Sequence, residues 1–199
     1  MATTFDDLKR FMDESELKYE SHEEDQVLAI GFGCEPTETT YRDAAGDPHV
    51  QVIVRIAEEG ELVAVCAPRT WNLADCDHRQ AVCEAATLIQ AQMKLIRFDL
   101  DADTWELQLN IEIPLEKAPM CGQQLHRAIA GILIAIRRYD PVVRHAMETG
   151  EVDFDLITKE TPTTRPTDVT RILDLANDAG GLDAIERLLG DSDAPTIEF

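Results

Sequence analysis

Hydrophobic and polar positions alternate most regularly in residues 95–113. Apolar residues at every second position there indicate two strands with one buried face, and residues 101–104 between them predict a turn. A second alternating pair, residues 49–57 and 61–67, is joined by a short connection that contains glycine, and residues 27–32 predict one more strand. These runs predict an antiparallel sheet built largely from hairpins.

Three other segments carry apolar residues at helical spacing. The first is expected to begin after a cap at Thr3 or Thr4, and the second after a cap at Asp75 or Asp77. The third is expected to be kinked or restarted at Pro141, since proline removes a helical hydrogen bond. The predicted order is α-β-β-β-α-β-β-α, an α+β class in which helices cover an antiparallel sheet.

The composition changes after Gly150. Residues 158–167 hold five threonines and two prolines, which predicts a linker, and two short amphipathic helical patterns follow it. We therefore divide the chain into an α+β domain at 1–149, a linker at 150–166 and an acidic helical tail at 167–199. Helices this short are marginal alone, so the apolar stripe of the tail is expected to pack on the domain or on a second copy. This stripe includes Leu173, Leu182 and Leu188.

Charge narrows the choice of partner. The chain has 39 acidic and 18 basic residues, a formal net charge of -21, which disfavours nucleic acid because phosphates would be repelled. Residues 151–199 share this acidity, with twelve acidic against four basic residues. The longest apolar stretch is far shorter than the roughly 20 residues that a bilayer requires, and the first residues do not resemble a signal peptide. We expect a cytoplasmic protein with no membrane association and a protein as its partner.

Motifs of catalysis are missing from the sequence. Cys76, His78 and Cys83 form the one cluster that could hold zinc, but their spacing does not match known zinc signatures. No triad or phosphate-binding motif accompanies them. We therefore expect no catalytic residue, no cofactor and no metal ligand. The cysteines are odd in number and scattered, which indicates reduced thiols. They are Cys34, Cys66, Cys76, Cys83 and Cys121. We expect Cys66 and Cys121 in or near the core.

Apolar side chains are better candidates for function. Trp71 is expected in a polar loop, either as a contact for a partner or as a plug over the core. Small residues on the second predicted helix, Ala81, Ala85 and Ala86, would permit a close approach of another helix, and Leu88 lies beside them. We therefore predict an interaction surface on this helix and a homodimer formed through it.

Several local patterns resemble the YbjN family, whose fold is similar to that of the class I type III secretion chaperones. The resemblance is carried by residues 84–93 (EAATLIQAQM), by IRFDL at 96–100 running into WELQL at 105–109, by Ile113-Pro114-Leu115, and by a final helix that ends near Tyr139-Asp140-Pro141. It covers residues 1–149 and excludes the tail. The resemblance implies a non-enzymatic, chaperone-like domain that binds protein; the family is also described as sensory-transduction regulators.

The sequence thus favours a cytoplasmic protein-interaction or chaperone-like module that binds apolar segments of a partner protein of unknown identity. One alternative is a regulatory ligand-binding domain. The other, less favoured, is a metal-dependent enzyme that uses Cys76, His78 and Cys83.

Overall fold

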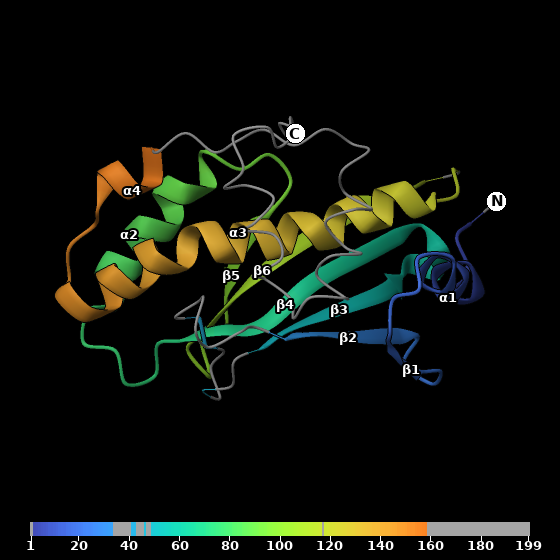
Figure 1. The fold of residues 1–199 in the computed structure, drawn as a ribbon, viewed down its shortest axis with the longest axis horizontal. Helices are drawn as coiled ribbons and strands as arrows, with labels where there is room; N and C mark the ends of the chain where they lie inside the picture. Colours follow the sequence, from blue (N-terminus) through green and yellow to red (C-terminus); the bar gives the residue numbers. More distant parts are fainter. Residues whose placement is uncertain (1, 34–40, 43–45, 47–48, 117, 159–199) are drawn as a thin grey trace.

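Six antiparallel strands form one sheet in the order β1-β2-β3-β4-β6-β5 in this computed structural model, which describes residues 2–33, 41–42, 46, 49–116 and 118–158. Figure 1 shows α3 running along the sheet, with α2 and α4 beside its C-terminal half and α1 at its other end. The strands are β1 (Glu20–His22), β2 (Val27–Gly33), β3 (His49–Ala57), β4 (Leu62–Asn72), β5 (Arg97–Leu100) and β6 (Glu106–Pro114). The helices are α1 (Phe5–Glu14), α2 (Arg79–Gln90), α3 (Gly122–Thr149) and α4 (Phe154–Thr158).

The predicted fold class is confirmed, with one additional strand. β1 has three residues, all exposed, so it has no alternation that a sequence pattern could reveal. Its pairing with β2 adds it to the edge of the sheet. The α+β class, the antiparallel sheet and the order of the remaining strands and helices agree with the prediction.

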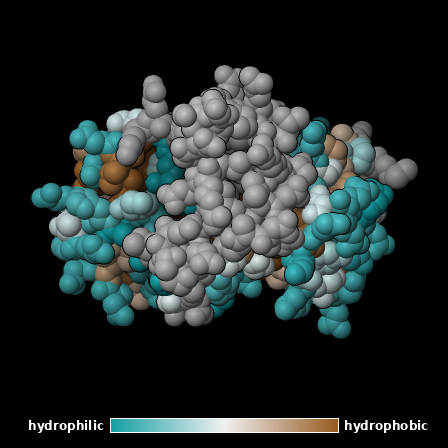
Figure 2. All heavy atoms as spheres, in the orientation of Figure 1, coloured by the Kyte–Doolittle hydropathy of each residue, from teal (hydrophilic) through white to brown (hydrophobic). Residues whose placement is uncertain are grey.

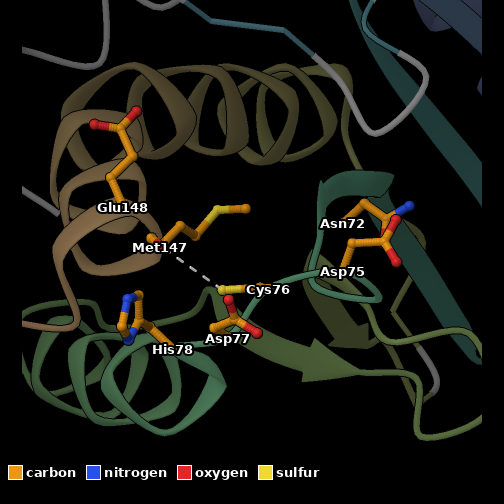
Figure 3. Close-up of a pocket in the computed structure, with 7 residues that line it drawn as sticks. All are labelled: Asn72, Asp75, Cys76, Asp77, His78, Met147 and Glu148. Atoms are coloured by element: carbon orange, nitrogen blue, oxygen red, sulfur yellow. Dashed lines mark hydrogen bonds between the residues drawn. The ribbon is translucent and has the colours of Figure 1, made fainter.

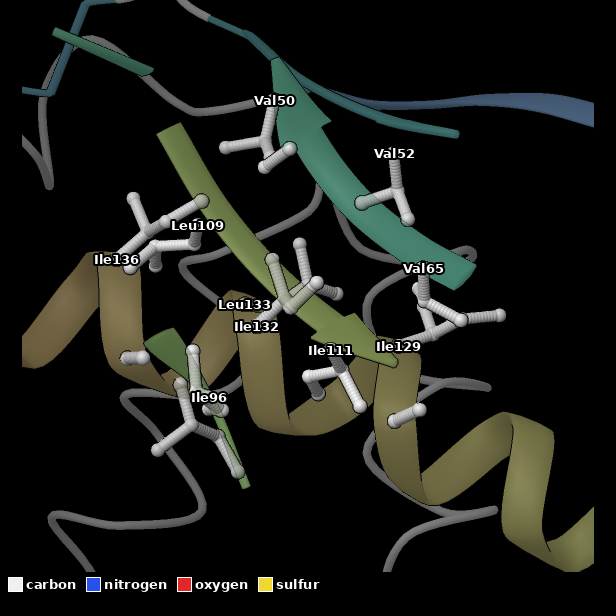
Figure 4. Close-up of a cluster of buried hydrophobic side chains, with 14 of the residues drawn as sticks. Val50, Val52, Val65, Ile96, Leu109, Ile111, Ile129, Ile132, Leu133 and Ile136 are labelled. Carbon is white, nitrogen blue, oxygen red and sulfur yellow. The ribbon is translucent and has the colours of Figure 1, made fainter. Parts of the chain in front are cut away.

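The core lies between the sheet and α3. Along β3 and β6, alternate residues are buried, and their neighbours in sequence face the other side of the sheet. Figure 4 shows valines, leucines and isoleucines of the strands meeting one face of α3. The α3 residues in this contact are all completely buried: Ile129, Ile132, Leu133 and Ile136.

The N-cap of α1 is Thr4, one of the two residues predicted for this position. Its hydroxyl accepts a hydrogen bond from the Asp7 amide at 3.1 Å, and the Asp7 carboxylate accepts one from the Thr4 amide at 3.0 Å. This reciprocal pair satisfies amide donors that a helix start leaves unpaired. The Thr4 hydrogen bonds also lower the pKa of Asp7.

The predicted start of the second helix was wrong. α2 begins at Arg79, with His78 and neither Asp75 nor Asp77 at the N-cap. Arg79 organises this start, because its guanidinium donates to the carbonyls of Leu73 and Ala74 and lies 4.3 Å from the centre of the Trp105 ring. An arginine that spans two segments through backbone acceptors leaves no local signal of the kind that a capping aspartate gives.

The expected end of the third helix near residues 139–141 was also wrong, because α3 continues through Pro141 to Thr149. Val142 and Val143, which follow the proline, are completely buried, so packing outweighs the hydrogen bond that proline removes. Cys121, expected near the core, is instead an exposed N-cap residue of α3.

Residues 150–158, at the start of the predicted linker, include the short helix α4. Its Ile157 is buried, and the Ile157 carbonyl accepts a hydrogen bond from Arg138 at 3.3 Å. The rest of the predicted linker and the whole tail, 167–199, lie outside the described residues, so the division into domain, linker and tail stays a prediction. None of the described helices is long and apolar enough to cross a membrane.

Gly150→Ala is expected to lower the melting temperature by about 2–8 °C, from a cost of about 1–2 kcal/mol. Gly150 ends α3 with a φ of +75°, and a Cβ there would lie 2.6 Å from His78 Nδ1. The matched control is Gly31→Ala, because a Cβ at Gly31 meets nothing within 4 Å. Thermal unfolding that is equal for the two variants would contradict this account of the helix end.

Candidate functional site: the free edge of β5

β5 lies at the edge of the sheet that the described residues form. Among the strands of the described residues it pairs with β6 alone, with Phe98 opposite Leu109 and Leu100 opposite Leu107. The Asp101 amide donates to the Glu106 carbonyl at 2.9 Å, so the main-chain amide of Asp101 points toward β6. Because these groups alternate along an antiparallel pair, the main-chain groups of Phe98 and Leu100 point away from β6.

The side chain of Gln90, at the end of α2, closes half of this edge. Its Nε2 donates to the Ile96 carbonyl at 2.6 Å, and its Oε1 accepts from the Phe98 amide at 3.0 Å. A side-chain amide with one donor and one acceptor thus occupies the place of a peptide group in a neighbouring strand. The Gln90 side chain therefore satisfies the Ile96 carbonyl and the Phe98 amide. Neither of these two hydrogen bonds involves the amide of Leu100.

Two exposed leucines flank β5. Large exposed hydrophobic side chains among the described residues are Leu95 (68% exposed), Leu100 (37%) and Phe154 (57%). Leu95 precedes β5 and Leu100 ends it, while Phe154 belongs to α4, at the end of the molecule where Figure 2 shows hydrophobic surface. A single exposed apolar residue is ordinary, and two that flank one edge strand make that edge a candidate contact surface.

Charges beside β5 are paired with each other. Arg97 lies 3.0 Å from Asp99 and 2.8 Å from Glu112, and this pairing lowers the pKa of Glu112. Asp99 also accepts a hydrogen bond from the Asn110 side chain at 2.9 Å. One guanidinium is thus paired with two carboxylates, and these three side chains together carry a net charge of -1.

The opposite edge of the sheet is less suitable for apolar contacts. β1 has only three residues, and an acidic turn follows it at residues 23–25. Glu23 there lies 3.0 Å from Lys9 of α1 and accepts a hydrogen bond from Ser21. This edge presents charge where β5 presents leucine.

Trp71 was predicted in a loop but lies in β4, where it is only 2% exposed. Its Nε1 donates to Asp140 of α3 at 2.9 Å, and its ring centre is 5.8 Å from that of Phe98. The structure therefore places it as a plug within the core, and the loop assignment was wrong because the strand continues past an irregularity between Ala67 and Trp71.

The small residues of α2 serve contacts within the chain. Ala81 and Ala85 are 9% and 0% exposed, and α2 packs against α3. Leu88 is half-buried and packs against the core. The close helix approach predicted from these residues is thus met by α3, while a homodimer stays a prediction. The other predicted contact residues, Leu173, Leu182 and Leu188, lie outside the described residues.

A pocket of about 480 Å³ lies between the segment before α2 and the end of α3 (Figure 3). Cys76 and His78 line it, and the Cys76 thiol donates to the Met147 carbonyl at 3.8 Å, whereas Cys83 is exposed on α2. Among the described residues, no group of three or more His, Cys, Asp or Glu side chains could hold a metal ion. The other lining residues are Asn72, Asp75, Asp77 and Glu148.

Sequence reasoning missed the β5 edge as a site. Leu100 fits the alternation of a buried strand, so its exposure at the strand end was not evident. Gln90 is an ordinary helix residue until the hairpin is placed beside it. The available signal was Leu95, an apolar residue next to Lys94 that breaks the alternation because Ile96 beside it is also apolar.

Comparisons with known proteins found likeness in structure only. A scan against family models and a search of curated proteins each gave no match. YbjN from E. coli, proposed to be a transcription regulator, has a TM-score of 0.48 and 13% identity, over 71% of this chain and 94% of that one. The HopA1–SchA chaperone–effector complex has a TM-score of 0.44 and 15% identity, over 66% of this chain and 88% of that one.

YbjN and a chaperone are also among the kinds of protein that the sequence resemblance named. At this level of similarity the fold class rests on the strand order and helix placement described above. The class that these features define is a helix-covered, six-stranded antiparallel α+β domain with one half-closed edge.

Proposed function

We propose that this protein is a non-enzymatic, chaperone-like interaction module of the cytoplasm whose β5 edge takes up an extended segment of a partner protein. The observation that carries the proposal is the pair of exposed leucines, Leu95 and Leu100, at the ends of an edge strand that Gln90 only half closes. An extended segment that adds to an edge gains main-chain hydrogen bonds, and its alternate side chains gain apolar contacts.

The chemistry of the edge describes the partner segment. One apolar residue of the segment would meet Leu100 at the end of β5 and another would meet Leu95 before it; because the two leucines are five positions apart, these two residues lie on opposite faces of the segment. Basic residues between them or beside them would be drawn to a chain of net charge -21, and the remaining acidic surface would keep the complex in solution. The partner is thus a protein with an extended, apolar and basic segment.

A comparison of three baits tests the proposal. Wild type, the double variant Leu95→Asp and Leu100→Asp, and the control Phe154→Asp would each capture protein from a lysate of the native cells. The double variant is expected to lose about tenfold or more of the captured partner, since burial of each leucine is worth about 1.5–3 kcal/mol. Phe154→Asp, which also places a carboxylate at an exposed hydrophobic site, is expected to retain it.

The three baits are expected to unfold at the same temperature, because all the altered residues are exposed. Equal recovery by the three baits would contradict the proposal. A loss confined to Phe154→Asp would place the contact on α4 in place of β5.

A regulatory ligand-binding domain is the second candidate, favoured by the pocket between Cys76 and Glu148. Three carboxylates line it, from Asp75, Asp77 and Glu148, so a small cationic ligand would suit it. Mass spectrometry of the protein under non-denaturing conditions tests this candidate. A stoichiometric small molecule that is lost on Asp77→Asn and Glu148→Gln would favour it over the interaction module.

A further inference from the structure

One side of α3 carries basic and apolar residues and turns away from the sheet. An α-helix turns by about 100° per residue, so the residues opposite to the core positions 129, 132, 133 and 136 form a separate row. We call this row the basic-apolar stripe. It consists of Arg127, Ala130, Gly131, Ile134 and Arg138, with Arg137 beside it.

The stripe differs in charge from the rest of the chain. No acidic residue occurs between Glu116 and Asp140, although acidic residues outnumber basic ones 39 to 18 overall. Arg127, Arg137 and Arg138 all fall within this interval. An acidic protein thus concentrates positive charge along one helix.

The apolar members of the stripe are covered. Ala130 is 1% exposed and Ile134 is 7% exposed, although their positions on the helix point them away from the sheet. α4 packs against α3 near Arg138, through the hydrogen bond to the Ile157 carbonyl. The chain therefore leaves α4 at Thr158 next to one end of the stripe, and 41 residues, 159–199, follow.

The segment that follows is complementary to the stripe in charge and in pattern. Residues 167–199 hold eight acidic and two basic residues. Their apolar residues recur at helical spacing in two runs on either side of Gly180-Gly181. An amphipathic acidic segment beside a basic-apolar helix face gains both from burial of its leucines and from attraction between opposite charges.

We propose that residues 167–190 dock in cis on the basic-apolar stripe of α3. The apolar residues of the segment, among them Leu173, Leu182 and Leu188, cover Ala130 and Ile134, while its acidic residues face Arg127, Arg137 and Arg138. This surface is on α3 and not on β5, so the proposal does not rest on the function proposed above.

Photo-crosslinking in the full-length chain tests the docking. A benzoylphenylalanine replaces Arg127, which is half-buried at the stripe, and in a control it replaces Gln108 on the other face of the sheet. Equal amounts of ¹⁵N-labelled and unlabelled protein are mixed before illumination, and the linked peptides are identified by mass spectrometry. The expected result is a link from position 127 to a peptide within 167–190 that never joins labelled to unlabelled chain.

A charge variant supplies a second readout. With the crosslinker at Ile134, Arg127→Glu is expected to lower the yield of the tail link about two- to fivefold, whereas Arg55→Glu, an exposed residue of β3, is expected to leave it unchanged. Links from the stripe that join labelled to unlabelled chains would overturn docking in cis and assign the stripe to a second copy. Links from the stripe to residues 2–158 alone, or links to the tail that are as frequent from position 108 as from position 127, would overturn the proposal entirely.

Discussion

Asp140→Ala is expected to lower the free energy of unfolding by about 3–5 kcal/mol. Asp140 of α3 is 2% exposed and joins three parts of the chain. It accepts a hydrogen bond from Trp71 Nε1 at 2.9 Å and pairs with Arg144 at 2.9 Å, and Arg144 in turn donates to the Arg42 carbonyl at 2.8 Å. Alanine would leave a buried indole N–H and a half-buried guanidinium without the carboxylate.

The matched variant Asp140→Asn separates lost hydrogen bonding from lost charge. Its amide oxygen can still accept from Trp71, so it is expected to cost less than the alanine variant. Urea denaturation followed by the fluorescence of the two tryptophans measures both. A cost below about 1 kcal/mol for Asp140→Ala, or equal costs for the two variants, would show that the network does not hold β4 to α3.

Wild type and Asp140→Asn are also expected to differ in how their stability depends on pH. Burial raises the pKa of Asp140 above the ordinary value for an aspartate, about 3.9, against the opposing effects of the Arg144 charge and the Trp71 hydrogen bond. The folded state thus holds the proton more tightly than the unfolded state. Its contribution to stability is complete below the unfolded pKa and is lost as the pH rises through the folded pKa.

Asparagine cannot ionise, so the stability of Asp140→Asn relative to wild type is expected to improve as the pH rises from below the ordinary pKa to neutrality. Denaturation at a series of pH values measures this difference. A difference that is constant across the series, or that moves in favour of wild type, would contradict the direction of the pKa change.

Gln90→Ala is expected to lower stability and strengthen partner binding at once. It removes the bonds to Ile96 and Phe98, at a cost of about 1–3 kcal/mol if these main-chain groups stay unpaired. The same groups then become free for an incoming strand. Thermal unfolding and titration of the partner captured by wild type measure the two effects.

Gln92→Ala is the control, because Gln92 is exposed and follows the end of α2. Its stability and its affinity for the partner are both expected to stay at the wild-type level. If Gln90→Ala weakens binding, then the Gln90 side chain belongs to the binding surface and does not close it.

The sequence predicts the elements with strong periodicity and fails where a particular side-chain contact decides where an element begins. The 49–57 strand, the 101–104 turn and the Thr4 cap follow from local pattern, since alternation and capping chemistry need no partner. The start of α2 depends on Arg79 reaching Leu73, Ala74 and Trp105, and no local rule contains that contact.

From the sequence, a sheet edge could be predicted as a kind of docking site, but not which of the two edges it is. Free sheet edges follow from any open antiparallel sheet, so an edge as a docking site could be expected. Which edge it is depends on Gln90 of α2 lying beside β5, a relation set by the packing of α2 against α3. Trp71 and Ala85 were predicted as contact residues because sequence alone does not show that both are buried within the chain.

Hydrogen exchange at single amides of β5, with and without the partner captured by wild type, tests the central claim most directly. If an extended segment adds to the β5 edge, the Leu100 amide, which points away from β6, is expected to exchange more slowly in the complex by about tenfold or more. The amides of β1 on the opposite edge are expected to stay unchanged. Slower exchange confined to β1, or to α2 and α3 with Leu100 unaffected, would contradict the assignment of β5 as the binding edge.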